Sequence, residues 1–374
     1  MTRVHPWQAA RWVVVLCIAC TPSVRAQTPS EPTTDPVPAI PEKPAEPLVP
    51  PAQPARAENG AATTPLAPQG GLAGLFNPTL GHLPIRADYR VTWFADERVA
   101  GQGAHLGYWQ NDAGLSFPLW QDCLNEWSAS ANVRAELFHT GAILPDTHQP
   151  FPDELWNVRF GTGYRHLFDN GWIGGASLTV GSASDRPFHS INEMTVGANL
   201  SLRVPQGEHN AWLFTLNYST NSEVLYGIPI PGIAYFWAPS EWFQATVGLP
   251  FANIIYRPLD DLTLELSYAL LTNIHAKASY RFAPGWKIHA GFDWSNENYY
   301  LADRTDDKAR LFYYDKRVTA GVQGHLAEHV TLDLSGGYSF DRFYFEGRRI
   351  SDSHDNRVDV ADGPFVAVRV EVRY

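Results

Sequence analysis

The sequence predicts an all-β protein, a single closed antiparallel transmembrane β-barrel of about 14–16 strands over residues 83–374. Three observations favour this fold: apolar and polar residues alternate along many short segments, aromatic residues stand near the ends of the apolar stripes, and short turns alternate with long polar loops. Side chains on a strand point alternately to opposite faces, so each segment has one apolar and one polar face. In a membrane barrel the apolar face meets lipid and the polar face an enclosed lumen.

Two segments are expected before the barrel. Basic residues precede the apolar stretch Trp12–Cys20, and small residues follow up to Ala26. This pattern predicts a signal peptide over residues 1–26 and export through the Sec pathway, with lipidation at Cys20 as the alternative. Residues 27–82 are rich in Pro and poor in large apolar side chains, which predicts a disordered periplasmic linker. A tether that contacts the cell wall is the alternative interpretation of this linker.

The alternation continues from residue 85 to the C-terminus. In one segment Ile274, Ala276 and Ala278 share the apolar face, while His275 and Lys277 share the polar face. The same period of two predicts strands within residues 85–93, 129–137, 158–164, 194–204, 212–218, 262–270, 274–282, 286–294, 318–322, 330–340 and 366–374.

The connections between these strands predict the two ends of the barrel. Tight turns are expected at residues 168–171, 239–241, 283–285 and 327–329, with a short connection around Pro250 and another at 272–273. Long polar loops are expected at residues 141–153, 182–192, 221–232, 301–309 and 347–363. Membrane barrels have short turns on the periplasmic side and long loops outside, so both ends of the barrel chain are expected on the periplasmic side.

The final strand carries a resemblance to a known class. Val368, Val370 and Val372 alternate with polar residues, and the chain ends on the aromatic Tyr374. This ending resembles the assembly signal of bacterial outer-membrane β-barrel proteins. Residues 248–252 are also similar to a segment of an uncharacterised family of such barrels. The resemblance implies a place in the outer membrane of a Gram-negative-type envelope, with lipid and the barrel-assembly machinery as partners.

The bulk composition excludes other classes. The formal net charge is -11 and basic clusters are absent, so nucleic acid is not an expected partner. Aromatic residues make up 13% of the chain, which suits the aromatic girdles of a membrane barrel. Two of the three cysteines lie in the expected signal peptide, and Cys123 alone forms no internal disulfide.

The polar faces of the expected strands carry more basic than acidic residues. The acidic ones are Asp88, Glu136, Glu265, Asp293, Asp333 and Glu371. A basic lumen concentrates anions and biases a pore toward them. The alternative is that these charges pair across neighbouring strands and close or stiffen the barrel. The residues predicted to line the lumen and to set its selectivity are Arg86, Arg90, Arg134, Arg159, Arg165, Arg203, Lys277, Arg281, Lys287, Arg369 and Arg373.

Metal binding and catalysis have weaker support. Asp352, Asp355 and Asp359 provide oxygen ligands of the kind that Ca²⁺ prefers, but they match no EF-hand spacing, and a solvated loop is the preferred interpretation. Catalysis needs a nucleophile beside a base, and the nearest candidates are residues 189–193 and 353–355. Adjacent residues on a strand face opposite sides, so neither group predicts a catalytic hydrogen bond. No enzyme activity, resident metal or cofactor is expected.

The function predicted from these patterns is a passive channel or small-solute transporter with a mildly basic lumen. One alternative is a non-conducting structural barrel whose outer loops bind partners. A second is a barrel enzyme that modifies lipids, and a third is a soluble β-sandwich with a core between two stacked sheets.

Overall fold

The computed structural model describes residues 79–222, 227–269, 273–353 and 356–374. The expected signal peptide over residues 1–26 and the expected linker up to residue 78 lie outside these ranges. Among the described residues, no helix is both long and apolar enough to cross a membrane. Two short 3-10 helices, η1 (Ile191–Glu193) and η2 (Ile350–Asp352), lie in connections between strands.

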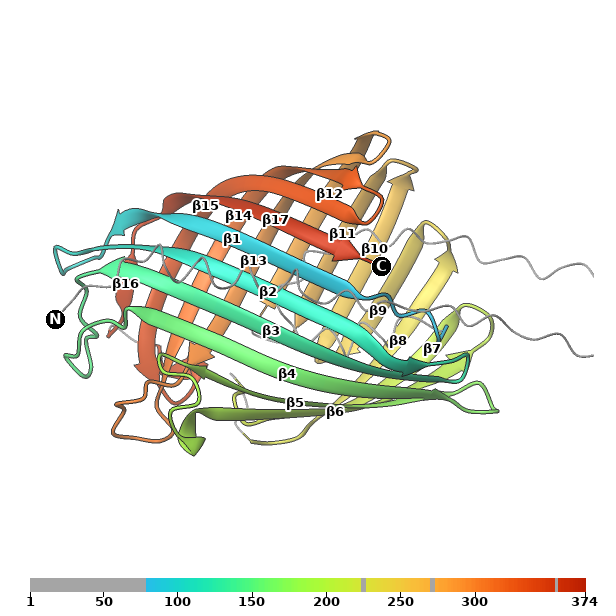
Figure 1. Cartoon of the computed structure of the whole chain (residues 1–374), viewed down its shortest axis with the longest axis horizontal. Coiled ribbons are helices and arrows are strands. Elements are labelled where there is room, and N and C mark those ends of the chain that lie inside the picture. Colours follow the sequence, from blue (N-terminus) through green and yellow to red (C-terminus); the bar gives the residue numbers. More distant parts are fainter. Residues whose placement is uncertain (1–78, 223–226, 270–272, 354–355) are drawn as a thin grey trace, which may run out of the picture. The chain divides into compact units, whose positions relative to one another are not determined.

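All the strands belong to one sheet (Figure 1). The first eight are β1 (Arg86–Arg98), β2 (His105–Gln121), β3 (Asn125–Thr140), β4 (Glu154–Leu167), β5 (Ile173–Ser184), β6 (Met194–Gln206), β7 (Asn210–Ser219) and β8 (Ile230–Ser240). The others are β9 (Phe243–Leu249), β10 (Phe251–Leu259), β11 (Leu262–Ala269), β12 (Asn273–Ala283), β13 (Trp286–Tyr299), β14 (Arg310–Ala327), β15 (Val330–Gly347), β16 (Val358–Val360) and β17 (Gly363–Arg373).

The sheet closes on itself. From β1 to β15 each strand pairs antiparallel with the next one along the chain, and β17 pairs with both β15 and β1. The closing ladder runs from the pair Arg86 and Arg373 to the pair Phe94 and Phe365. The three-residue β16 pairs with the loop end of β15 and forms one bridge, from Val360 to Val99, so sixteen strands form the ring. This confirms the predicted closed barrel, and the alternative of a two-sheet sandwich is wrong because a single closed sheet replaces two stacked ones.

The two ends of the barrel differ as predicted. Short turns follow β2, β4, β6, β8, β10, β12 and β14, and the described chain enters and leaves the barrel at this same end. The longer connections, over residues 141–153, 185–193, 300–309 and 348–362, all lie at the other end. The short connection predicted at Pro250 is confirmed between β9 and β10, whereas most of the turn predicted at 272–273 lies outside the described residues.

The wall of the barrel has two contrasting faces. Large apolar side chains such as Phe160, Leu200 and Leu334 are 51%, 55% and 52% exposed on the outer face. Inward residues such as Arg134 and Asp333 are 8% and 7% exposed. An outward face that stays apolar around the ring is what lipid contact requires.

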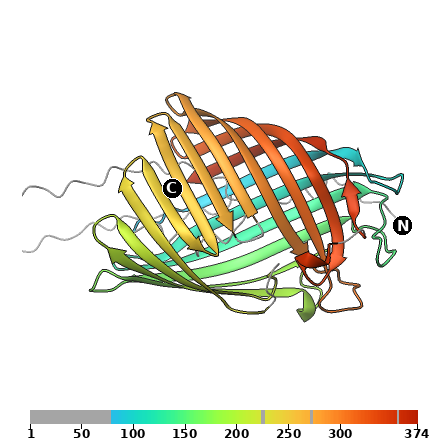
Figure 2. The same cartoon turned by 180° about the vertical axis from the view of Figure 1, so that it is seen from behind.

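The wall has an uneven height. β2, β3, β14 and β15 contain 16 to 18 residues, whereas β9, β10 and β11 contain 7, 9 and 8. Figure 2 shows β8–β12 ending well short of the loops that cap β13–β15. The rim at the loop end is therefore low along β9–β11 and high on the opposite side.

The tip of β13 crosses the loop end and hydrogen-bonds to β5. The backbone N–H of Tyr300 donates to the carbonyl of Ala183 at 2.8 Å, and Asp185 N–H donates to the carbonyl of Tyr300 at 3.3 Å. A parallel bridge joins Ser184 to Tyr300. Seven strands, β6 to β12, separate β5 from β13 in the ring, so this contact encloses β1–β5 and β13–β17 in a smaller ring at the loop end.

The interior of this smaller ring is an aromatic core. Tyr108 of β2 and Tyr313 of β14 join their hydroxyl groups at 2.8 Å across the barrel. The alternation predicted a polar inner face, whereas at the loop end the inner face is largely aromatic and aliphatic. The buried residues of the core are Phe94, Val99, Leu106, Tyr108, Phe138, Ala142, Leu144, Phe151, Leu155, Ala183, Tyr299, Leu311, Tyr313, Tyr344, Val358, Val360 and Phe365.

Candidate functional site

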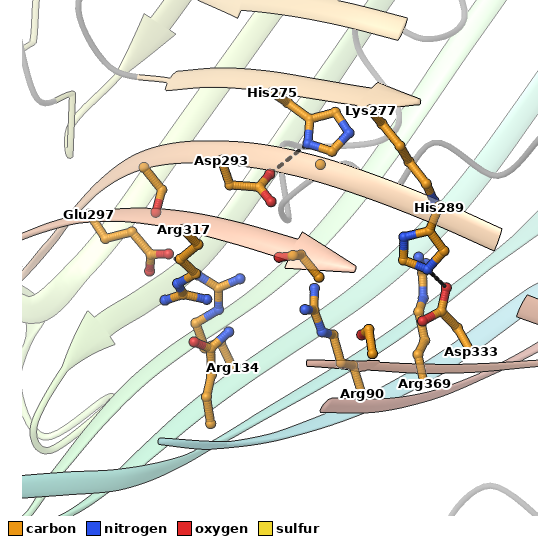
Figure 3. Close-up of a pocket in the computed structure, with 15 residues that line it drawn as sticks. Arg90, Arg134, His275, Lys277, His289, Asp293, Glu297, Arg317, Asp333 and Arg369 are labelled. Atoms are coloured by element: carbon orange, nitrogen blue, oxygen red, sulfur yellow. Dashed lines mark hydrogen bonds and ion pairs between the residues drawn. The ribbon is translucent and has the colours of Figure 1, made fainter. Parts of the chain in front are cut away.

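A polar cavity lies inside the barrel, on the short-turn side of the aromatic core (Figure 3). The volume of this cavity is about 70 Å³, which is room for several waters or one small ion. Eight strands contribute side chains to it: β1, β2, β3, β12, β13, β14, β15 and β17. The lining residues are Arg90, Gln110, Arg134, His275, Lys277, His289, Gly291, Asp293, Ser295, Glu297, Arg317, Thr319, Asp333, Ser335 and Arg369.

The cavity exists because the strand alternation places polar residues on the inner face and because small residues stand among them. Gly291 lies opposite Lys277 in the ladder between β12 and β13. A Cβ atom added at Gly291 would meet only the carbonyl oxygen of Ala276 within 4 Å, at 3.1 Å. The inner surface beside Lys277 is therefore open.

Five basic side chains face three carboxylates in this cavity. Three of the basic residues have acidic partners. Arg134 binds Asp112 at 2.5 Å and also pairs with Glu297 across the barrel. Arg317 pairs with Asp315, and Arg369 lies 3.5 Å from Asp88 and 3.9 Å from Glu371.

The other two basic residues, Arg90 and Lys277, have no such partner. Within the described residues, neither side chain makes a hydrogen bond or an ion pair. Glu265 stands directly opposite Lys277 in the ladder between β11 and β12, yet no ion pair within 4.0 Å joins them. Lys277 is only 6% exposed, so its ammonium group depends on whatever occupies the cavity.

Two histidines of the cavity are held by carboxylates. His275 Nδ1 lies 2.5 Å from Asp293 Oδ1, and His289 Nε2 lies 2.9 Å from Asp333 Oδ2 (Figure 3). The pairing through Nδ1 orients the His275 ring so that its Nε2 atom lies in the cavity, buried and without a hydrogen-bond partner among the described residues. No role was predicted for these histidines, because they stand singly along the chain.

Four of the eleven residues predicted to line the lumen come together in this cavity: Arg90, Arg134, Lys277 and Arg369. Most of the others lie on the inner face nearer the short-turn end and are paired with acidic residues. Arg86 lies 3.0 Å from Glu371, Arg281 lies 2.7 Å from Asp261, Arg373 pairs with Glu371, and Arg165 pairs with Glu126. Cross-strand pairing, the alternative interpretation of the lumen charges, therefore describes this part of the barrel.

Three predicted residues remain. Arg203 of β6 is buried, and its guanidinium lies 5.9 Å from the ring centre of Phe236. Lys287 of β13 is half-buried near the turn to β12. Arg159 of β4 lies on the inner face, next to β3, the strand that carries Arg134. None of the three lines the cavity described above.

Sequence reasoning missed several members of the site. Gln110, Ser295, Thr319 and Arg317 were not singled out, although Arg317 carries one of the five charges of the cavity. His275 and Asp293 are direct partners in the ladder between β12 and β13. The register shifts between Arg281 and Ala283, so counting back from the turn would place His275 opposite Trp294, and the sequence alone did not predict this pair.

The catalytic candidates in the loops have structural roles. The hydroxyl of Ser190 donates to Glu193 at 3.0 Å, and the Ser190 N–H donates to the same carboxylate at 2.5 Å, which caps η1. No described contact joins His189 to that hydroxyl, so the segment is no nucleophile and base pair. His354 and Asp355 of the second candidate lie outside the described residues.

Two of the three candidate Ca²⁺ ligands, Asp352 and Asp359, already form contacts within the loop. Asp352 accepts from the N–H groups of Arg348 and Arg349 at 2.9 and 3.0 Å, and Asp359 pairs with Arg357 at 2.7 Å. Asp355, the third candidate Ca²⁺ ligand, lies outside the described residues. In the neighbouring loop the N–H of Lys308, then Arg348, hold the pKa of the Asp306 carboxyl below its usual value.

Comparison with known proteins gives similarity at the level of solved structures alone. No family model and no curated protein matches the chain. An outer membrane channel, COG4313, from Pseudomonas putida F1 is 9% identical, with a TM-score of 0.36, and the match covers 78% of this chain and 95% of that one.

Two further solved structures are similar to the same extent. The toluene transporter TodX of Pseudomonas putida is 8% identical, with a TM-score of 0.36 and coverage of 78% and 89%. OccK7 (OpdD) of Pseudomonas aeruginosa is 10% identical, with a TM-score of 0.35 and coverage of 78% and 99%. Because these identities and TM-scores are low, the assignment of this chain as a closed sixteen-strand antiparallel β-barrel rests on the pairing of its own strands.

Proposed function

We propose that this protein is a passive outer-membrane channel for small solutes, with a preference for anions. The observation that carries the proposal is the enclosed polar cavity, in which five basic residues face three carboxylates inside a wall with an apolar outer face. A lumen lined with excess positive charge raises the local concentration of anions and excludes cations. A wall that is apolar on its outer face and closed around the ring suits insertion into a bilayer.

The uneven rim suggests where the solute passes. The aromatic core fills the loop end between β1–β5 and β13–β17, so we propose that solute passes between the polar cavity and the loop end beside the low rim of β9–β11. The inner face of β6 and β7 carries polar side chains such as Asn199, Ser201 and Asn217. A transmembrane strand needs about 9–11 residues at a tilt of about 45°, and β9 and β11 fall short of this.

Conductance across planar bilayers tests the channel directly. In a KCl gradient, the reversal potential is expected to show a preference for chloride. Arg203→Gln removes an inward charge without an ion pair and is expected to weaken this preference. Lys308→Gln makes the same change in charge on an exposed loop and should leave the reversal potential within experimental scatter. A barrel without conductance, or with a preference for potassium, would contradict the proposal.

The orientation in the membrane has its own test. Cys123 is a free, exposed thiol in the turn between β2 and β3, at the short-turn end. With this end in the periplasm, a membrane-impermeant maleimide should label Cys123 only after the outer membrane is disrupted. A second cysteine placed in an outer loop, Thr305→Cys in a Cys123→Ser background, should react in intact cells. The reverse pattern of labelling would place the long loops in the periplasm.

The proposal includes the expected assembly route. The terminal residues Val368, Val370, Val372 and Tyr374 would be read by the barrel-assembly machinery, and the linker before the barrel would lie in the periplasm, where it can contact the cell wall. Val368, Val370 and Val372 lie in the ladder that joins β17 to β1 and closes the barrel.

A second candidate is a non-conducting structural barrel. The aromatic core across the loop end and the ion pairs between strands favour it, since both stiffen and fill the lumen. The bilayer experiment separates the two functions: in a closed barrel Arg203→Gln alters stability alone and no current is measured.

A further inference from the structure

We propose that Lys277, His275 and Arg90 form a binding site for a small oxyanion, so that solute passes through the barrel by saturable binding. This inference deepens the proposed channel function and depends on it. The ligand class is a phosphate or a short carboxylate, because both present several oxygen acceptors to basic groups in a small volume.

Lys277 is the first element of the site. Its side chain is 6% exposed and reaches the cavity from β12 without a hydrogen bond or ion pair to any described residue. A buried ammonium group without a partner is unfavourable unless water or a counter-ion binds it. The open surface at Gly291, directly opposite in the ladder, leaves the space that such an ion needs.

His275 is the second element and lies two residues before Lys277, on the same face of β12. Asp293 accepts from Nδ1, which leaves Nε2 buried in the cavity without a partner among the described residues. A ring protonated on both nitrogens donates from Nε2 to an anion oxygen, and a ring protonated on Nδ1 alone accepts there from the hydroxyl of hydrogen phosphate.

Arg90 reaches the same cavity from β1, on the wall opposite β12 (Figure 3). Its guanidinium has no ion pair or hydrogen bond among the described residues, and it offers a planar fork of donors. A ligand between β1 and β12 would therefore meet a point charge on one side and a fork on the other.

Each carboxylate of the cavity is held by another side chain, and among the described residues none lies within 4.0 Å of the Lys277 ammonium or the Arg90 guanidinium. Asp293 accepts from His275, Asp333 is paired with His289, and Glu297 accepts from the hydroxyl of Tyr299 at 2.7 Å. Arg134, Arg317 and Arg369 are engaged by Asp112, Asp315 and Asp88. The groups left over are the donors of Lys277 and Arg90, with His275 Nε2 beside them, and the charge of the two basic residues selects an anion.

Single-channel and macroscopic currents in planar bilayers test the site with inorganic phosphate, and in a parallel series with succinate. Phosphate current is expected to saturate with concentration, and Lys277→Gln and Arg90→Gln should each raise the half-saturating concentration at least tenfold. Lys277→Arg keeps the charge and should stay within about threefold of the native protein. Saturation by succinate alone would assign the site to carboxylates, and saturation by phosphate alone to phosphate.

Arg203→Gln is the matched control, because it removes an inward charge that does not line the cavity. It should shift the reversal potential yet change half-saturation less than twofold. A phosphate current that rises linearly, or an equal effect of Lys277→Gln and Arg203→Gln on half-saturation, would overturn the site and leave the channel proposal standing.

The site can also be tested without any current. Calorimetric titration of the detergent-solubilised full chain with phosphate should give binding that Lys277→Gln abolishes and Lys277→Arg retains. Such binding in a barrel that does not conduct would support the site and overturn the channel. Absence of both binding and current would overturn both proposals. Migration of the unheated protein on a gel shows beforehand that each variant has folded.

Discussion

Phe94→Ala is expected to lower the free energy of unfolding by about 3–5 kcal/mol, the range for removing a large aromatic side chain from a packed interior. Phe94 is 1% exposed and lies at the centre of the aromatic core. Its ring stacks on Tyr108 with centroids 4.2 Å apart and lies 5.4 Å from Phe365. The guanidinium of Arg317 also lies 4.6 Å from the ring centre. The substitution removes all of these contacts and leaves a void beside a buried charge.

Denaturant titration of the protein in lipid vesicles, followed by tryptophan fluorescence, measures this loss. Phe160→Ala is the matched control, since Phe160 is the same residue type on the outer face of β4 and is 51% exposed. Lipid chains can fill the space left on the outer face, so the control loses the transfer free energy of the ring, about 1.5–3 kcal/mol, without a cavity term. Equal losses for the two variants would show that the core is not packed as described.

The aromatic core also shows where the sequence stops being informative. Phe94 and Phe138 continue the inward face of their strands with the same period of two as the charged residues before them, and Tyr108 shares the inward face of β2 with Asp112. The predicted segments 85–93 and 129–137 end just before Phe94 and Phe138, and no segment was predicted around Tyr108, so none of the three was assigned to a face. Whether inward residues meet across the barrel depends on the contact between β5 and β13. These two strands lie far apart along the chain, so no local sequence pattern predicts that contact.

Eleven of the sixteen ring strands were predicted from their own alternation, whereas no segment was assigned to β2, β5, β8, β9 or β10. The alternation in 274–282 or 330–340 comes from the demand for one apolar face, and turns such as Pro284-Gly285 mark where the chain reverses. The lengths of the strands, which set the height of the barrel wall, were harder to predict from the sequence. Strands β2, β14 and β15 run past the apolar stripe into aromatic and polar residues, where the pattern no longer separates lipid from a packed interior.

The candidate site was predicted in part for the same reason. Arg90, Lys277 and Arg369 were assigned to the lumen by their position on the polar face, and they do line the cavity. Their differing environments could not be read from the chain, because a partner such as Asp88 or Asp112 is chosen by register and by distance across the barrel. Arg317 was missed because it stands beside a cluster of aromatic residues at the loop end of β14.

Arg134→Met is expected to lower the free energy of unfolding by about 3–5 kcal/mol, since it breaks a buried ion pair on one side only. Arg134 joins Asp112 on the neighbouring strand β2 to Glu297 on β13, across the barrel. The side chains of the two acids are 4% and 17% exposed. Without the guanidinium, two carboxylates share the interior with no compensating charge between them, and the link between β3 and β13 is lost.

Arg281→Met is the control for this substitution. Arg281 and Asp261 form an ion pair near the short-turn end, with side chains 40% and 48% exposed, so its loss should cost no more than about 1 kcal/mol. A triple variant, Arg134→Met with Asp112→Asn and Glu297→Gln, should recover at least half of the loss, because the unfavourable term is the uncompensated charge rather than the missing contact. If the triple variant is no more stable than Arg134→Met, packing of the arginine stem holds β3 against β13, and the charges contribute little.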